Sequence, residues 1–140
     1  MKNINIALFI ITLFVCNVAF ADVAVIVNSG NSVSSLNKND VKRIFLGKKK
    51  KFPGGGKIAL IDNKAGSTTR DTFYQKVIGK DSAQIKSYWS TMIFSGKGTP
   101  PTEVGSDADV IAKIAKDSNA IGYVDASAVT GNVKTIFTIK

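Results

Sequence analysis

The sequence has no histidine and a single cysteine, Cys16, and these two shortages exclude most of the usual chemistry of protein sites. Without histidine there is no Ser-His-Asp triad, and without a Cys/His cluster there is no zinc site of the common kind. A Ser-Lys arrangement or a carboxylate pair remains formally open, but the acidic residues are scattered and mostly occupy expected helix starts and turns. We therefore expect no enzyme activity, no metal and no cofactor.

Long apolar runs are also scarce, and the one that exists is at the start of the chain. Residues 4–15 are almost entirely apolar and lie between Lys2 and the sequence Ala19-Phe20-Ala21. A positive charge, a short apolar core and an A-x-A site, in this order, are typical of a secretory signal peptide, and the run is too short to span a membrane. We expect residues 1–21 to be a signal peptide that is cleaved after Ala21.

The exported part, residues 22–140, is expected to form one domain in the periplasm. Cys16 suggests a lipoprotein as an alternative, but Val15 stands where a lipoprotein signal needs a small residue. Once Cys16 is removed with the signal there is no disulfide, so a single hydrophobic core must hold the domain.

Acidic residues are few, since 10 Asp and Glu stand against 19 Lys and Arg and give a net charge of +9. This balance favours anionic partners, such as small oxyanions, acidic polymers or a charged envelope surface. Nucleic acid is not expected, because the chain is exported and carries no nucleic-acid-binding motif.

The four lysines at 48–51 repel one another and predict a solvated loop. The glycines at 54–56 with Lys57 lack the spacing of a phosphate loop, because Ile58 follows.

Strands and helices are predicted to alternate along residues 22–140. The aliphatic run at 22–27 predicts a strand covered on both faces, and further strands are expected at 57–61, 120–124 and 133–139. This pattern predicts an α/β domain whose mixed, partly parallel sheet is flanked by helices. The order of the strands does not follow from the sequence.

Four helices are predicted between these strands. The first covers about 40–46 with Asn39 as N-cap, the second runs from the segment after Gly66 to about Ile78, and Gly79 ends it. The third starts at Asp81 or Ser82, and its predicted core-facing stripe has helical spacing: Ile85, Tyr88, Trp89, Met92 and Ile93. The fourth is capped by Ser106 and turns Val110, Ile111, Ile114 and Ala115 inward.

The segment Gly66-Ser67-Thr68-Thr69-Arg70-Asp71-Thr72-Phe73 follows a strand and opens a helix. Backbone N–H groups of a first helical turn have no intrahelical partner and lie at the positive end of the helix dipole. Hydroxyl and guanidinium groups add donors suited to phosphate or carboxylate. The segment therefore predicts an oxyanion site formed by Gly66, Ser67, Thr68, Thr69 and Arg70. The alternative is that Ser67 is an ordinary N-cap.

Three further residues are candidates for the edge of this site. Lys64 adds a positive charge shortly before the motif, and Ser29 and Gly30 follow the first strand and would face the same pocket. A plain turn is the alternative for Ser29 and Gly30.

The chain resembles the phosphate-binding proteins of bacterial phosphate transporters and the wider type II periplasmic binding proteins. Four segments carry the resemblance in the family's order: Ile44-Phe45-Leu46-Gly47-Lys48, the motif at 66–73, Gly96-Lys97-Gly98 and Ile121-Gly122-Tyr123-Val124. The motif resembles the family's G-S-G-T-R-x-x-F pattern. The resemblance implies a lobe that holds a tetrahedral oxyanion through Ser67, Thr69 and nearby amides, with Arg70 beside it.

The chain departs from this family in three respects. Residues 22–140 supply only one of the two lobes that family members close around the ligand, so weak binding is expected unless a second chain, as in a homodimer, closes the site. Thr68 replaces the middle glycine of the motif. Asn63 and Ala65 stand where the family has Arg and Asp, and the acidic group that helps the family to exclude sulfate is absent.

The leading hypothesis is therefore an exported binding domain for phosphate or a related oxyanion, which serves uptake or sensing with a membrane transporter or a sensor. The alternative is a protein-interaction module on a lobe without a ligand. In that case the lysine loop at 48–51 would contact another envelope protein.

Overall fold

The first strand of the sheet follows from the aliphatic run predicted near residue 22. The computed structural model describes residues 22–140, so the predicted signal peptide and Cys16 lie outside the described residues. In the strand β1 (Val23–Asn28), Val23, Val25 and Val27 join one core cluster, whereas Ala24 and Ile26 join another. The prediction that this strand is covered on both faces is therefore confirmed.

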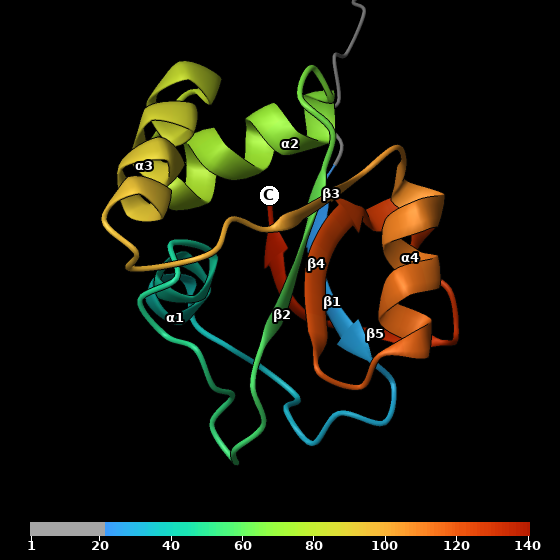
Figure 1. Cartoon of the computed structure of the whole chain (residues 1–140). Helices are drawn as coiled ribbons and strands as arrows, with labels where there is room; N and C mark the ends of the chain where they lie inside the picture. Colours follow the sequence, from blue (N-terminus) through green and yellow to red (C-terminus); the bar gives the residue numbers. More distant parts are fainter. Residues whose placement is uncertain (1–21) are drawn as a thin grey trace, which may run out of the picture.

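β1 belongs to a five-stranded mixed sheet with the order β3-β2-β4-β1-β5. The other strands are β2 (Ala59–Asn63), β3 (Thr102–Val104), β4 (Ala120–Asp125) and β5 (Val133–Ile139). β2 runs parallel to β3 and β4, whereas β1 is antiparallel to β4 and β5. The predicted mixed, partly parallel sheet is confirmed, and Figure 1 shows it between helices on both sides.

The helices that cover the sheet are α1 (Lys38–Phe45), α2 (Thr68–Phe73), the π-helical turn η1 (Tyr74–Ile78), α3 (Ser82–Phe94), α4 (Asp107–Lys116) and the short 3-10 turn η2 (Ala126–Ala128). α4 packs on one face of the sheet, and the other long helices lie on the opposite face (Figure 1). Within residues 22–140 no helix has the length and apolar character needed to cross a membrane.

Local capping explains where most helices begin and end. Asp81 and Gln84 form a reciprocal capping box at the start of α3, and the Ser106 side chain caps α4. Gly79 ends the second helix with φ 75°, a left-handed conformation that glycine adopts without a steric penalty. The Ser106 cap, the stop at Gly79 and a start of α3 at Asp81 or Ser82 were predicted from the sequence, but the capping box with Gln84 was not.

Three local predictions need correction. The N-cap of α1 is Asn37, whose Oδ1 accepts from Asp40 N at 2.8 Å, so the prediction of Asn39 was wrong. β2 begins at Ala59 rather than at 57. β3 was not predicted, because three residues are too few to show a periodic pattern.

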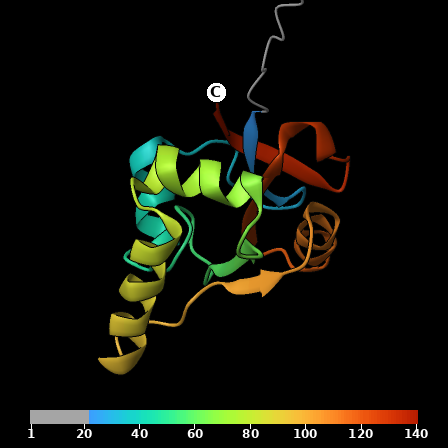
Figure 2. The same cartoon turned by 90° about the horizontal axis from the view of Figure 1, so that it is seen from above.

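The predicted core-facing stripe of α3 is only partly correct. Ile85 and Trp89 are buried and Tyr88 and Met92 are half-buried, but Ile93 is 55% exposed. Seen from above, the carboxyl-terminal half of α3 extends away from the sheet (Figure 2), so its last turn has no core to face. The stripe of α4 is likewise partial, since Val110 and Ile114 are buried but Ile111 is only half-buried.

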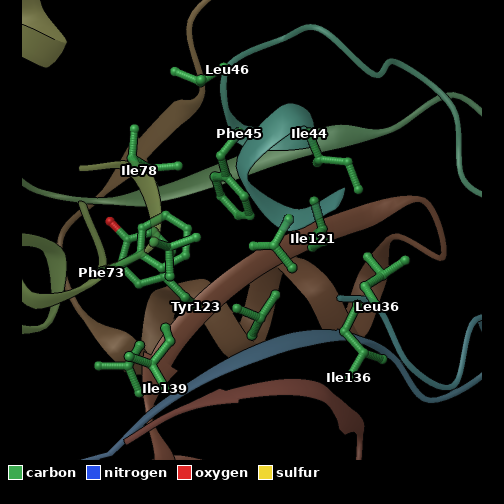
Figure 3. Close-up of a cluster of buried hydrophobic side chains, with 14 of the residues drawn as sticks. Leu36, Ile44, Phe45, Leu46, Phe73, Ile78, Ile121, Tyr123, Ile136 and Ile139 are labelled. Carbon is green, nitrogen blue, oxygen red and sulfur yellow. The ribbon is translucent and has the colours of Figure 1, made fainter. Parts of the chain in front are cut away.

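Aromatic side chains form the centre of the larger core cluster, on the sheet face that α1 and α2 cover (Figure 3). The rings of Phe73 and Tyr123 stack with centroids 4.0 Å apart, and Phe45 meets Phe73 edge-on at 4.7 Å. Such pairs add to the free energy gained from burial alone. This packing anchors the helix that follows residue 67 firmly on β4.

Candidate functional site

The candidate oxyanion loop lies where three parallel strands end. Because β2, β3 and β4 run in the same direction, their carboxyl ends meet at one edge of the sheet. Residues 64–67 leave β2 at this edge and lead into α2, at the top of the molecule in Figure 1. Ligands of open α/β sheets commonly bind at such an edge.

The first turn of α2 carries backbone donors that the protein leaves open. Among residues 22–140, the N–H groups of Thr68 and Thr69 have no protein acceptor. Gly66 has φ 89°, which gives the chain its sharp turn before the helix. Because η1 continues α2 without a break, the donors lie at the amino end of a helix that extends to Ile78. Unpaired N–H groups at such an end favour an anion.

Ser67 is the N-cap of α2, as the alternative interpretation of the sequence expected. Its Oγ accepts from Arg70 N at 3.3 Å. A hydroxyl that accepts in this way still has a proton to donate, so capping does not prevent Ser67 from contacting an anion.

Arg70 lies under the loop and is held by partners within the protein. Its Nη1 donates to Asn63 O at 2.8 Å and lies 3.7 Å from Asp62 Oδ2 and 3.3 Å from Glu103 Oε2. The side chain is buried, and its guanidinium lies 5.3 Å from the centre of the Tyr74 ring. The structure thus brings Arg70 beside Ser67 and Thr69, but its Nη1 already contacts groups of the protein.

A buried carboxylate, Asp62, stands at the centre of this arrangement. The Tyr74 hydroxyl donates to Asp62 Oδ2 at 2.6 Å, and the Tyr123 hydroxyl donates to Oδ1. Burial raises the pKa of the Asp62 carboxyl, and the hydrogen bonds from Tyr123 and Tyr74 and the charge of Arg70 offset this only in part. Burial and the nearby carboxylate also raise the pKa of both phenols, which keeps them protonated as donors.

Glu103, the only glutamate of the sequence, completes the set from β3. Its Oε1 accepts from Ala65 N at 2.9 Å, and its Oε2 faces Arg70 Nη1. A negative charge therefore stands next to Ala65, where the family resemblance indicates that an acidic residue has been lost. This carboxylate also occupies one backbone donor of the loop.

Neither Asp62 nor Glu103 was among the predicted site residues, and neither were the two tyrosines. The Asp62 and Tyr123 side chains meet although they are 61 residues apart, which only the order of strands explains. A polar residue at the carboxyl end of an aliphatic strand was the one local signal for Asp62.

The remaining candidates are not all brought together. Lys64 is exposed next to the loop, as expected. Ser29 and Gly30 follow β1, which is antiparallel to β4, so they lie at the opposite edge of the sheet from residues 64–67. The expectation that they face the same pocket needs correction. They form a turn, in which Gly30 N donates to Asn28 Oδ1 at 2.8 Å.

The arrangement offers hydrogen-bond donors and a buried cation, but no arrangement suited to a metal. Residues 22–140 contain no group of three Asp, Glu, His or Cys side chains that could hold a metal ion. The loop therefore presents hydrogen-bond donors of the kind that suit an anion.

A family model described as "PBP superfamily domain" matches residues 12–136. The chain therefore belongs to this family of periplasmic-binding-protein domains, and the resemblance found in the motifs is confirmed. No curated protein matches the sequence.

Solved structures with the same fold include receptors for phosphate. An ABC-type phosphate transport receptor from Vibrio cholerae is 21% identical, with a TM-score of 0.66 over 83% of this chain and 46% of that chain. A putative phosphate ABC transporter substrate-binding protein with bound phosphate from Clostridium perfringens is 24% identical, with a TM-score of 0.66 over 83% of this chain and 45% of that one. PstS from Borrelia burgdorferi is 16% identical, with a TM-score of 0.61, covering 84% and 48%. The chain thus spans less than half the length of each.

Proposed function

We propose that this protein binds phosphate or a related oxyanion, without catalysis, at the loop that joins β2 to α2. The observation that carries the proposal is the pair of unpaired N–H groups of Thr68 and Thr69 at the start of α2. The hydroxyls of Ser67, Thr68 and Thr69 supply further donors, and Gly66 permits the turn that aims them. Family membership and the fold shared with phosphate receptors support this choice of ligand.

In this proposal Arg70 acts from beneath the loop rather than as a direct donor. Its Nη1 donates to Asn63 O and lies near the carboxylates of Asp62 and Glu103, which fixes the strand end from which the loop departs. Its charge also offsets part of the repulsion that Asp62 and Glu103 exert on an arriving anion. Lys64 adds an exposed positive charge at the rim.

A loop on a single lobe buries an anion from one side only, so we expect modest affinity that a second surface would raise. That surface is a second copy of the chain or a membrane transporter or sensor of the envelope. The protein then serves phosphate uptake or sensing as an exported, periplasmic component.

One backbone donor can be removed without removing the helix, and this gives the sharpest test. Thr68 is the first residue of α2, where proline is well tolerated, and Ser67 already has the extended conformation that precedes a proline. Thr68→Pro removes both the N–H and the hydroxyl, whereas Thr68→Ala removes only the hydroxyl. The difference between the two variants isolates the N–H group.

We expect calorimetry to show saturable phosphate binding that Thr68→Pro weakens about tenfold more than Thr68→Ala, the range of a hydrogen bond to a charged group. Ser82→Pro makes the same change at the first residue of α3 and should leave binding unchanged. A parallel sulfate titration reports on selectivity. Absence of heat from either anion at millimolar concentration would contradict the proposal.

The second candidate is a protein-interaction module without a small ligand. It is favoured by one observation: Glu103 already occupies Arg70 Nη1 and the Ala65 N–H, so the protein supplies its own carboxylate to the loop. The calorimetric result separates the two functions, because a module of this kind gives no saturable response to phosphate.

A further inference from the structure

A cavity lies at the opposite end of β2 from the proposed oxyanion loop. It has a volume of about 480 Å³ and is partly open to solvent. Four lysines line it (Lys49, Lys50, Lys57 and Lys97), and Ile58 and Leu60 contribute an apolar wall. This volume is within the range of small-molecule sites. The proposed oxyanion site uses none of these residues.

Most of the positive charge in this cavity has no carboxylate partner. Lys49 Nζ lies 3.2 Å from Asp40 Oδ1, and this is the one ion pair that the four lysines make among residues 22–140. Lys50 Nζ donates to the carbonyl oxygen of Lys97 at 3.4 Å, which leaves its charge uncompensated. Lys50, Lys57 and Lys97 therefore line one cavity without a carboxylate partner among residues 22–140, and an anion with more than one charge would offset their charges.

A short hairpin holds part of this cluster in place. Phe52 N donates to Gly56 O at 3.1 Å, and Ile58 N donates to Lys50 O at 2.9 Å. The hairpin sets Lys51 directly opposite Lys57, and like charges in this position destabilise a strand pair. Phe52 is buried and anchors the turn. The loop predicted to be solvated is exposed at Lys48, Lys50 and Lys51, and the backbone hydrogen bonds of the hairpin hold its last two lysines in place.

The cavity wall on the side of α3 rests on Trp89. A Cβ atom placed on Gly47 would lie 3.0 Å from the indole ring, and one placed on Gly98 would lie 3.5 Å from it. Both glycines line the cavity, so the ring packs directly behind its wall. Trp89 is the only tryptophan of the sequence, and its fluorescence therefore reports on this cavity.

We propose that this cavity binds an organic phosphate, with the phosphate held by Lys50, Lys57 and Lys97 and a short apolar portion placed against Ile58 and Leu60. Lysine binds phosphate as a compact point charge, without the planar matching that arginine offers to carboxylates. Three lysines without a carboxylate partner favour a dianionic phosphate monoester over a monovalent carboxylate. The apolar wall favours an ester over inorganic phosphate.

The same chemistry has two sources in a cell envelope: a soluble phosphate ester and the headgroup of an anionic lipid. The experiment uses hexyl phosphate and methyl phosphate as soluble probes, and vesicles of phosphatidylglycerol against vesicles of phosphatidylcholine. Calorimetry and Trp89 fluorescence are recorded on the protein for the soluble probes, and co-sedimentation for the vesicles.

The variant Lys57→Gln/Lys97→Gln removes two of the cavity's charges. Lys113→Gln/Lys116→Gln makes the same change in net charge on the exposed side of α4 and serves as the matched control. Thr68→Pro alters the oxyanion loop only. We expect saturable hexyl phosphate binding that shifts Trp89 fluorescence, weakens at least tenfold in the cavity variant and changes less than twofold in the other two.

Methyl phosphate should bind more weakly than hexyl phosphate, because it has no chain to cover the apolar wall. Sedimentation with phosphatidylglycerol vesicles that hexyl phosphate reverses would assign the site to a lipid headgroup, and no sedimentation would assign it to a soluble ester. The proposal is overturned if hexyl phosphate does not saturate at millimolar concentration, if the control variant loses as much affinity as the cavity variant, or if only Thr68→Pro reduces binding.

Discussion

The two ends of β2 carry charged side chains in opposite arrangements. At the carboxyl end, the buried Arg70 faces the buried Asp62 and the more exposed Glu103, so each of the three charged side chains has a partner of opposite charge. At the amino end, lysines stand beside lysines around an open cavity. Charges that are paired fix the backbone of a loop, whereas charges left without partners are available for an external anion. The two ends of β2 therefore differ in role: paired charges hold the backbone at its carboxyl end, and unpaired charges at its amino end are available to an anion.

Removing the Arg70 side chain should have the largest effect on stability, because it breaks the buried ion pair at the carboxyl end of β2. Arg70→Ala leaves Asp62 buried without its cation, and breaking such a pair costs about 3 kcal/mol of unfolding free energy. Urea unfolding measures the loss, with the exposed Lys64→Ala as control. An Arg70→Ala protein as stable as the unchanged one would mean that the two tyrosines alone satisfy Asp62.

The buried carboxylate should also make stability depend on pH with a recognisable sign. Because the folded pKa of Asp62 is raised above 3.8, the folded state holds the proton more tightly than the unfolded state. The contribution of this group to stability is therefore complete below pH 3.8 and is lost as the pH rises through the folded pKa. The slope is at most about 1.4 kcal/mol per pH unit.

The variant Asp62→Asn isolates this effect. Relative to Asp62→Asn, the unchanged protein should lose unfolding free energy as the pH rises above 3.8, and thermal unfolding across this range measures the difference. Asp71→Asn alters an exposed carboxylate and should not reproduce the effect. If the difference between the two curves grows in the opposite direction, the buried side chain favours its charged form.

A substitution of Glu103 tests whether the carboxyl end of β2, where the charges are paired, also binds an anion. This prediction rests on the proposed oxyanion loop. Glu103→Gln removes a negative charge that lies 2.9 Å from Ala65 N, so phosphate should bind about fivefold more tightly, which is about 1 kcal/mol. Calorimetry measures the change, with Asp117→Asn as a control of equal charge. A weaker affinity would show instead that the Glu103 carboxylate accepts a proton from the bound anion.

The smallest effect is expected at the lysine hairpin. Lys51→Glu replaces the like-charged pair Lys51–Lys57 by an opposite pair and should stabilise the fold by about 0.5 kcal/mol. Lys48→Glu changes the net charge equally on an exposed side chain outside this cross-strand pair. Equal gains in both variants would mean that general repulsion between lysines, and not the hairpin geometry, sets the cost.

The sequence predicted the elements whose signals are local. The caps Ser67, Asp81 and Ser106 and the stop at Gly79 follow from backbone chemistry that neighbouring residues determine. The two-sided burial of β1 follows from an unbroken aliphatic run. The proposed oxyanion loop rests on the same kind of signal, because hydroxyl residues and a glycine at a helix start form a local pattern.

The partners of the loop could not be found in the same way. Asp62 meets Tyr123 only because β2 and β4 are neighbours in the sheet, and the order of strands has no local signal. Glu103 lies on a strand too short to show periodicity. Arg70 was predicted as a donor to the anion from the local motif, and only the long-range contacts show that Nη1 is already engaged within the protein.

The antiparallel course of β1 has a consequence for the connectivity of the chain. The first residue of β1, Val23, is the direct partner of Ile139, the last residue of β5. A linker of a few residues could therefore join them, and the chain could be opened in the hairpin at Gly55, where nothing lies within 4 Å of an added Cβ atom. In such a circular permutant the strands would follow one another along the chain in a different order, and the sheet would be the same. The pairing of Val23 with Ile139 thus makes the order of the strands along the chain separable from their order in the sheet.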